Sequence, residues 1–148
     1  MATKQAAPSV LFVDDSSQDL ELVKAAFEEA RSDAQIRCVQ TVAAAKAYLL
    51  GRPPYDNRGD NPAPTIVLLD IQIPGEDGFA LLSWLRGRKE DWRQVPVIML
   101  TASHAFSAIR KAYDAGANSF LVKPAGFDEL VKMVTDLSRF WLKHNRQG

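Results

Sequence analysis

The chain has 148 residues, the length of one ordinary domain, and its 18 basic side chains are balanced by 18 acidic ones. A chain without net charge has no general attraction for nucleic acid or for an anionic membrane, so we expect neither as a partner. The single cysteine, Cys38, excludes an internal disulfide, and its apolar neighbours favour a buried structural thiol over a reactive one. No apolar run approaches the ~18 residues of a membrane span and no signal peptide is present, so we expect a soluble cytoplasmic protein.

Five short apolar runs predict the strands of a parallel sheet. Each is followed by a segment with helical periodicity, and the third run is apolar throughout, as in a strand buried on both faces. Five strand-then-helix units with short connections predict one α/β domain with helices on both faces of the sheet. The runs cover residues 9–13, 36–39, 65–69, 95–100 and 119–122.

Capping residues mark the ends of the expected helices. Ser16 with Asp19 three places later has the spacing of a capping box that opens the first helix. Thr41 is placed to cap the second helix, and Gly116 to end the fourth. The last helix is expected from about residue 127 almost to the end of the chain. At ~100° per residue, its core-facing stripe comprises Phe127, Leu130, Val134, Leu137 and Trp141.

An unusually long connection covers residues 51–64 and contains four prolines and two glycines. We expect a loop there, and loops of this length in compact domains are often functional. It includes Arg58-Gly59-Asp60, the integrin-binding tripeptide, but a three-residue match occurs too readily by chance to support an interaction.

Polar side chains follow four of the five expected strands. Asp14 and Asp15 follow the first, Asp70 the third, Thr101 the fourth and Lys123 the fifth. Ligands of open α/β sheets bind beyond the carboxyl ends of the strands. Three carboxylates close together repel one another and require a cation, and an all-oxygen site suits Mg²⁺. Beside such a cation and a lysine, one carboxylate can attack phosphorus and form an aspartyl phosphate, and a threonine hydroxyl can bind a remaining oxygen.

These residues resemble, in order and spacing, the pattern of bacterial response-regulator receiver domains. The resemblance rests on Asp14-Asp15, residues 69–78, Thr101-Ala102 and Lys123-Pro124, and it extends over residues 9–141. It implies a flavodoxin-like (βα)5 doubly wound parallel sheet with strand order 2-1-3-4-5. It also implies a signalling phosphoacceptor, which is not a conventional enzyme although it catalyses its own phosphorylation and dephosphorylation.

The same resemblance assigns roles to the acidic residues. Asp70 would accept a phosphoryl group from a histidine kinase and would also contact the metal. Asp15 would bind Mg²⁺ directly and Asp14 through a water molecule, and Gln72 would bind the metal through its backbone carbonyl.

The remaining roles concern the other strand ends. Thr101 and Lys123 would hold the phosphoryl oxygens, and the Lys123–Pro124 peptide bond would be cis. Phe120 would be the switch aromatic that turns inward when Thr101 moves toward the phosphoryl group. From the residues alone, Phe120 is equally well explained as part of the core.

The ends of the chain narrow the resemblance. The long loop, the absence of an output domain and the sequence Phe140-Trp141-Leu142 are similar to the small stand-alone regulators that partner phytochrome-type histidine kinases. The expected partner is therefore a sensor histidine kinase of the bacteriophytochrome type. We expect the domain core at residues 9–142 and flexible tails at 1–8 and 143–148.

Other interpretations were weighed against this one. A phosphatase with an aspartyl-phosphate intermediate would want a second acid where Gln72 stands, and a flavodoxin would have a glycine-rich loop after the first strand. The alternative kept is a pseudo-receiver, an unphosphorylated interaction module, which would be expected to lack an acidic residue or Lys123. Glu76 and Asp77 are interpreted as turn and helix-start residues, and Trp92 as packed locally. His104 and His144 are interpreted as solvent-facing.

The last helix carries more apolar surface than one sheet can cover. Met133 and Phe140 lie beside the core-facing stripe on one flank, with Val131 and Leu142 on the other. Either the fourth helix and lysine stems cover these flanks, or a partner does. We expect a homodimer through the face made by the fourth helix, the fifth strand and the last helix, because receiver domains commonly dimerise there.

Overall fold

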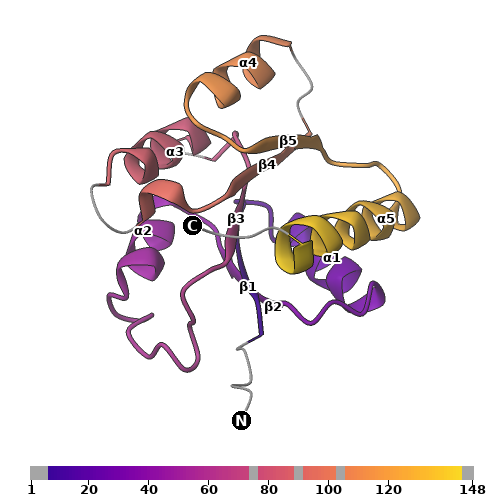
Figure 1. Ribbon diagram of the computed structural model, residues 1–148, viewed down its shortest axis with the longest axis horizontal. Coiled ribbons are helices and arrows are strands. Elements are labelled where there is room, and N and C mark those ends of the chain that lie inside the picture. Colours follow the sequence, from indigo (N-terminus) through magenta and orange to yellow (C-terminus); the bar gives the residue numbers. More distant parts are fainter. Residues whose placement is uncertain (1–6, 74–76, 89–91, 103–105, 145–148) are drawn as a thin grey trace.

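The computed structural model describes residues 7–73, 77–88, 92–102 and 106–144. Its parallel sheet has the strand order β2-β1-β3-β4-β5, which confirms the predicted doubly wound topology (Figure 1). Predictions about Glu76 and His104, about the side chain of His144 and about most of the two tails concern groups outside the described part. The strands are β1 (Ser9–Val13), β2 (Gln35–Val39), β3 (Ile66–Leu69), β4 (Val97–Thr101) and β5 (Ser119–Val122).

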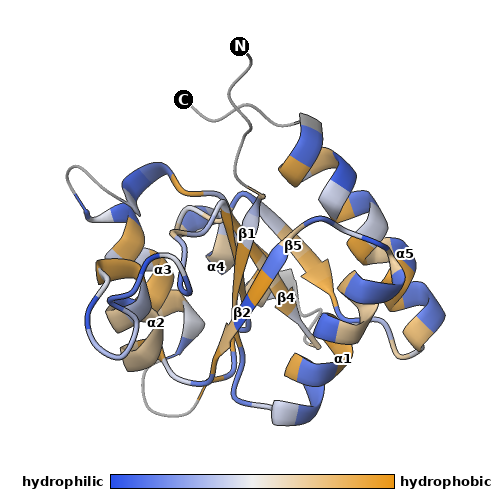
Figure 2. Cartoon of the chain, turned by 90° about the horizontal axis from the view of Figure 1, so that it is seen from below, coloured by the Kyte–Doolittle hydropathy of each residue, from blue (hydrophilic) through white to orange (hydrophobic). Residues whose placement is uncertain are grey.

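Helices cover both faces of the sheet (Figures 1 and 2). On one face lie α1 and α5, and on the other lie α2, α3 and α4. None of the helices in the described ranges has the length and apolar character that a membrane crossing needs. The helices are α1 (Ser17–Glu29), α2 (Val42–Leu50), α3 (Gly78–Arg86), α4 (Phe106–Asp114) and α5 (Phe127–Leu137), with a 3-10 helix η1 (Trp92–Gln94) and a π-helix η2 (Ser138–His144).

The central strands are buried on both faces, as their unbroken apolar sequences predict. Successive side chains of a strand point to opposite faces, so each strand contributes to two cores. In β1, Leu11 and Val13 join the core under α2 and α3, while Val10 and Phe12 join the core under α1 and α5. This double burial fixes the register of the strands and hence the positions of the residues at their carboxyl ends.

The predicted helix caps are present. Ser16 Oγ accepts a hydrogen bond from the Asp19 backbone N–H at 3.2 Å, and Thr41 Oγ1 accepts one from Ala44 at 3.0 Å. Asp77 caps α3 by accepting from the Ala80 N–H at 3.0 Å, so its interpretation as a helix-start residue is confirmed. At the end of α4, Gly116 takes a φ of 105°, a conformation that favours glycine.

The long loop between α2 and β3 is held against the end of α2. The Arg58 guanidinium donates to the carbonyl oxygens of Tyr48 and Leu49, both at 2.8 Å. Tyr48 in turn donates its hydroxyl to the Pro62 carbonyl at 2.8 Å. Trp92 donates Nε1–H to the Leu49 carbonyl at 3.0 Å, so Trp92 packs locally as predicted. The loop therefore supplies hydrogen-bond partners for polar groups at the end of α2 that would otherwise lack them.

The predicted stripe of the last helix is right except at its first residue. Leu130, Val134 and Leu137 are buried, but Phe127 is 38% exposed. It is the first residue of α5, where the chain has only just turned onto the sheet. After Leu137 the helix continues as the π-helix η2, where the assumed 100° per residue no longer holds, yet Trp141 is half-buried and packs against the same core, as predicted.

Candidate functional site

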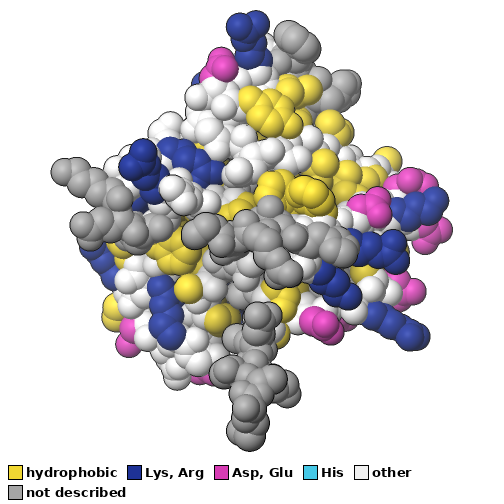
Figure 3. Space-filling view, viewed as in Figure 1, with side chains coloured by type: hydrophobic (Ala, Val, Ile, Leu, Met, Phe, Trp, Pro, Cys, Tyr) yellow, Lys and Arg dark blue, Asp and Glu magenta, His cyan; other side chains and the backbone are white. Residues whose placement is uncertain are grey.

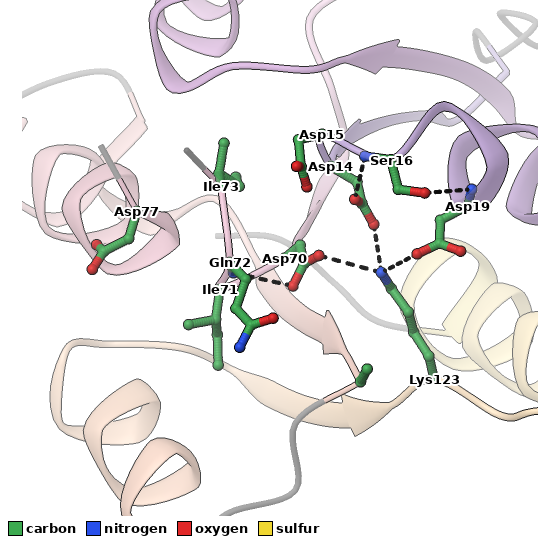
Figure 4. Close-up of a pocket in the computed structure, with 11 residues that line it drawn as sticks. Asp14, Asp15, Ser16, Asp19, Asp70, Ile71, Gln72, Ile73, Asp77 and Lys123 are labelled. Atoms are coloured by element: carbon green, nitrogen blue, oxygen red, sulfur yellow. Dashed lines mark hydrogen bonds and ion pairs between the residues drawn. The ribbon is translucent and has the colours of Figure 1, made fainter. Parts of the chain in front are cut away.

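Three carboxylates converge at the carboxyl ends of β1 and β3. The two strands pair in parallel with Val13 opposite Leu69, and the Asp70 N–H donates to the Val13 carbonyl at 3.0 Å. The residues that follow these strands therefore lie side by side (Figure 4). One carboxylate oxygen from each of Asp14, Asp15 and Asp70 lies within 4.8 Å of the others. The structure thus brings together the predicted acidic cluster.

Backbone groups orient the two buried carboxylates. Asp14 is fully buried and its Oδ1 accepts from the Ser16 N–H at 2.9 Å. Asp70 is buried as well, and its Oδ1 accepts from the Gln72 N–H at 3.2 Å. Burial raises the pKa of Asp14, and hydrogen bonds from Lys123 and Ser16 oppose this rise. With Oδ1 held by the backbone, Oδ2 of each residue faces the cleft.

Lys123 reaches the same carboxylates from the end of β5. Its Nζ lies 2.5 Å from Asp14 Oδ2, 2.8 Å from Asp19 Oδ2 and 3.3 Å from Asp70 Oδ2. Burial alone would lower the pKa of Lys123, but hydrogen bonds to Asp14 and Asp19 and the charge of Asp70 raise it above its ordinary value. The ammonium group therefore stays protonated at neutral pH and offsets part of the negative charge of the site.

Asp19 belongs to the site, and its role there was missed from the sequence. Its spacing from Ser16 was explained by helix capping, and the backbone half of that cap is present. Its carboxylate, however, turns to Lys123 rather than back to Ser16 (Figure 4). A usable signal was its place in the first turn of a helix that begins directly after the Asp14-Asp15 pair, where side chains point back toward the strand end.

Thr101 and Phe120 lie on neighbouring strands close to the site. Thr101 is buried at the end of β4, and its carbonyl oxygen accepts from the Lys123 N–H at 2.8 Å. Phe120 pairs in register with Met99, two residues before Thr101, and packs half-buried against the core beneath α2, α3 and α4. Gln72 presents an exposed side chain to the cleft, and Asp77 lies at its rim.

The Lys123–Pro124 bond departs from the prediction. Among the described residues, the cis peptide bond is Pro53–Pro54 in the long loop, so the predicted cis bond at Pro124 is wrong for this structure. An X–Pro bond favours trans by roughly 0.5–1 kcal/mol.

The donor set fits a divalent cation of the magnesium type. Asp14, Asp15 and Asp70 offer carboxylate oxygens to a cleft of about 650 Å³, which Gln72 also lines. Hard cations such as Mg²⁺ prefer oxygen ligands and keep several water molecules. Asp15 is exposed, so a hydrated ion can reach it from solvent.

The family follows from this geometry and from sequence comparison. Residues 10–135 match the response regulator receiver domain. The chain belongs to this family. As a receiver domain, it is part of the two-component signalling machinery, and the predicted flavodoxin-like fold and family are both confirmed.

Similar receiver proteins come from several organisms. The chain is 34% identical over 137 residues to the probable methanogenesis regulatory protein FilR2 of Methanothrix harundinacea, covering 93% of this chain and 85% of that protein. It is 31% identical over 134 residues to the response regulator Rcp1 of Synechocystis sp., covering 90% and 88% respectively. Rcp1 has also been solved in an Mn²⁺-bound form.

Two similar solved structures are regulators from red-light or phytochrome signalling. The response regulator RPA3017 in red light signaling of R. palustris aligns with a TM-score of 0.88 and 34% identity, covering 94% of this chain and 96% of that one. The phosphorylated cyanobacterial phytochrome response regulator RcpA aligns with a TM-score of 0.84 and 26% identity, covering 95% and 98%. The chain is thus similar to phytochrome response regulators over nearly all of its length.

Proposed function

We propose that this receiver accepts a phosphoryl group on Asp70 from a histidine kinase in a Mg²⁺-dependent reaction. The observation that carries the proposal is the position of Asp70, which shares its cleft with two further carboxylates and with the Lys123 ammonium. Asp14 and Asp15 would hold the metal with Asp70 and the Gln72 carbonyl. Asp70 is the one of the three that follows the central strand β3.

The chain's own residues account for the transfer. An oxygen of the ionised Asp70 carboxylate attacks phosphorus, the bond from phosphorus to the kinase histidine nitrogen breaks, and an acyl phosphate forms. The Lys123 ammonium, already 3.3 Å from Asp70 Oδ2, donates to the transferred oxygens, and the Thr101 hydroxyl binds another. Bound Mg²⁺ supplies further positive charge beside these oxygens.

The signal would leave the site through Thr101 and Phe120. Movement of the Thr101 hydroxyl toward the phosphoryl group vacates space beside β5, and Phe120 would turn inward to fill it. Support comes from their positions on adjacent strands, with Phe120 only half-buried and therefore able to rotate. These two residues would be the two-state element of the switch.

We also propose that the protein acts in phytochrome-type light signalling, as a cytoplasmic regulator of a bacteriophytochrome-like kinase. The support is its similarity to RPA3017 and RcpA over nearly the whole chain. The similarity to FilR2 is of comparable extent, so the kinase is best identified by phosphotransfer from candidate kinases, compared by rate.

The output surface would be a homodimer face over β5 and the adjoining helices. Figure 3 shows hydrophobic side chains gathered over β5 beside α4 and α5. Exposed apolar residues there include Tyr113, Val122 and Phe127, with Phe140 at 55% exposure. Met133 and Phe140 line a groove of about 450 Å³ along this face. A two-fold contact needs only one such self-complementary patch.

The test is labelling by acetyl phosphate with Mg²⁺. Wild type should gain one acid-stable, base-labile phosphoryl group, and Asp70→Asn should gain none. Asp77→Asn is the matched control, because Asp77 lies at the rim of the same cleft and an asparagine still caps α3. An unlabelled wild type would favour the pseudo-receiver, and comparable labelling of Asp70→Asn would place the acceptor elsewhere.

A further inference from the structure

Asp19 differs from the other carboxylates that contact Lys123. An ammonium group has three N–H donors, and here Asp14, Asp19 and Asp70 each accept from Lys123 Nζ. Asp14 and Asp70 also belong to the acidic cluster that could hold a cation, whereas Asp19 lies outside that cluster in the described part of the chain. Asp19 is therefore the partner of Lys123 that a bound cation leaves in place.

We propose that Asp19 is a positioning residue that keeps the Lys123 ammonium beside Asp70 while the cation and the phosphoryl group take over the other carboxylates. The proposal rests on the function proposed for Asp70. When a cation binds, the oxygens of Asp14 and Asp70 are drawn toward it, and phosphorylation removes the charge of the attacking Asp70 oxygen. The contact to Asp19 is spared both changes.

The local structure makes Asp19 suitable for this task. It lies in the first turn of α1, which Ser16 caps and which Leu20 fixes to the core. Its backbone is thus fixed relative to β1, while its carboxylate points across the cleft at Lys123 from the side opposite Asp70 (Figure 4). The side chain is 36% exposed, so water partly screens the contact.

Loss of the Asp19 charge should change both the lysine and the ligands of the site. In Asp19→Asn the ammonium keeps only its contacts to Asp14 and Asp70, where it competes directly with the cation. We expect the dissociation constant for Mg²⁺ to rise about two- to fivefold, the range for a partly exposed ion pair. At saturating Mg²⁺, affinity for beryllofluoride should fall by a similar factor, because the ammonium is no longer directed at the acyl phosphate position.

The first measurement uses metal-free protein and no phosphodonor. Nuclear magnetic resonance of the Lys123 ¹⁵Nζ group should show faster hydrogen exchange and a shifted resonance in Asp19→Asn. Asp128→Asn is the matched control. Asp128 is an exposed acid in the first turn of α5, so this substitution also removes one negative charge from the start of a helix. An unchanged Lys123 signal in Asp19→Asn, or the same change in Asp128→Asn, would overturn the proposal.

The second measurement compares Asp19→Asn with Asp19→Glu in Mg²⁺ and beryllofluoride titrations. Glutamate keeps the charge on a longer side chain and should restore most of the affinity that asparagine loses. Failure of Glu to restore any affinity, or tighter beryllofluoride binding in Asp19→Asn, would contradict a positioning role. If instead wild type is never phosphorylated, the function proposed for Asp70 fails, while the metal-free lysine measurement still decides whether Asp19 holds Lys123.

Discussion

Gly78, the first residue of α3, packs so closely on the backbone of Asp70 that a Cβ at residue 78 would overlap the Asp70 carbonyl oxygen. The Gly78 N–H also donates to the Ile71 carbonyl at 3.0 Å. These contacts hold the start of α3 against the segment that leaves β3. The absence of a side chain at residue 78 therefore allows the start of α3 to pack directly on the backbone of Asp70, the proposed phosphoacceptor.

Gly78→Ala should destabilise the protein by about 1–3 kcal/mol, the usual cost of forcing an extra methyl group into a packed site. Urea denaturation measures the loss of unfolding free energy. Gly126→Ala is the control. A Cβ there meets no atom within 4 Å, so the change should cost only the preference of an N-cap position for glycine over alanine, at most about 1 kcal/mol. Equal stability of Gly78→Ala and wild type would show that the start of α3 moves freely away from Asp70.

The proposed metal ligands Asp14 and Asp15 should contribute unequally to Mg²⁺ affinity. Asp15→Ala removes the proposed direct ligand and should weaken Mg²⁺ binding about a hundredfold, whereas Asp14→Ala removes the ligand proposed to act through water and should weaken it about tenfold. Titration of Mg²⁺ ranks the two variants. Equal losses would mean that the inner and outer ligands have been assigned wrongly.

The acidic cluster and Lys123 were predictable because parallel strands end at one edge of a sheet. Apolar runs that stop on Asp14, Asp70 and Lys123 define those ends without any knowledge of the packing. The role of Asp19 could not be found in this way, because its spacing from Ser16 already had a sufficient local explanation. Side-chain direction across a cleft depends on the angle between α1 and the sheet, which sequence spacing does not contain.

The predictions that failed, for Phe127 and for the Lys123–Pro124 bond, also concern features that sequence spacing does not contain. The exposure of Phe127 reflects where α5 first meets the sheet, and a helical wheel carries no information about that point. The π-helix after Leu137 changes the number of residues per turn, which a helical wheel assumes to be constant, although Trp141 still packs against the core. The bond before Pro124 is trans, whereas the sequence alone allows either isomer of an X–Pro bond.

Thr101→Ala should separate phosphorylation from signalling. The variant keeps Asp70 and Lys123, so acetyl phosphate should still label it, but the hydroxyl that links the phosphoryl group to Phe120 is gone. Chemical-shift changes on adding beryllofluoride should reach the site and fade around Phe120 and α5. Thr101→Ser keeps the hydroxyl and should behave like wild type. Wild-type shift changes at Phe120 in Thr101→Ala would show that the coupling follows another route.

Phe140→Asp should dissociate the proposed dimer into monomers without unfolding the domain. Phe140 is 55% exposed and stacks edge-on against Trp141, with ring centroids 5.0 Å apart, so it extends the apolar groove outward rather than filling the core. A charge at its position would be desolvated in a dimer but hydrated in a monomer. Sedimentation should show a wild-type dimer in at least one of two states, without or with beryllofluoride. Phe140→Asp should be a monomer in both states and should still be phosphorylated.

Leu22→Asp is the matched control for this surface. Leu22 is 41% exposed but lies on α1, away from α4 and β5, so the same change of an exposed apolar residue to aspartate should leave the dimer intact. Dissociation by Leu22→Asp as strongly as by Phe140→Asp would place the contact on α1 or indicate general loss of solubility. A wild type that sediments as a monomer both with and without beryllofluoride would exclude this face as a dimer interface. A Phe140→Asp protein that stays dimeric would exclude it too, because a carboxylate buried there without a partner should oppose association by several kcal/mol.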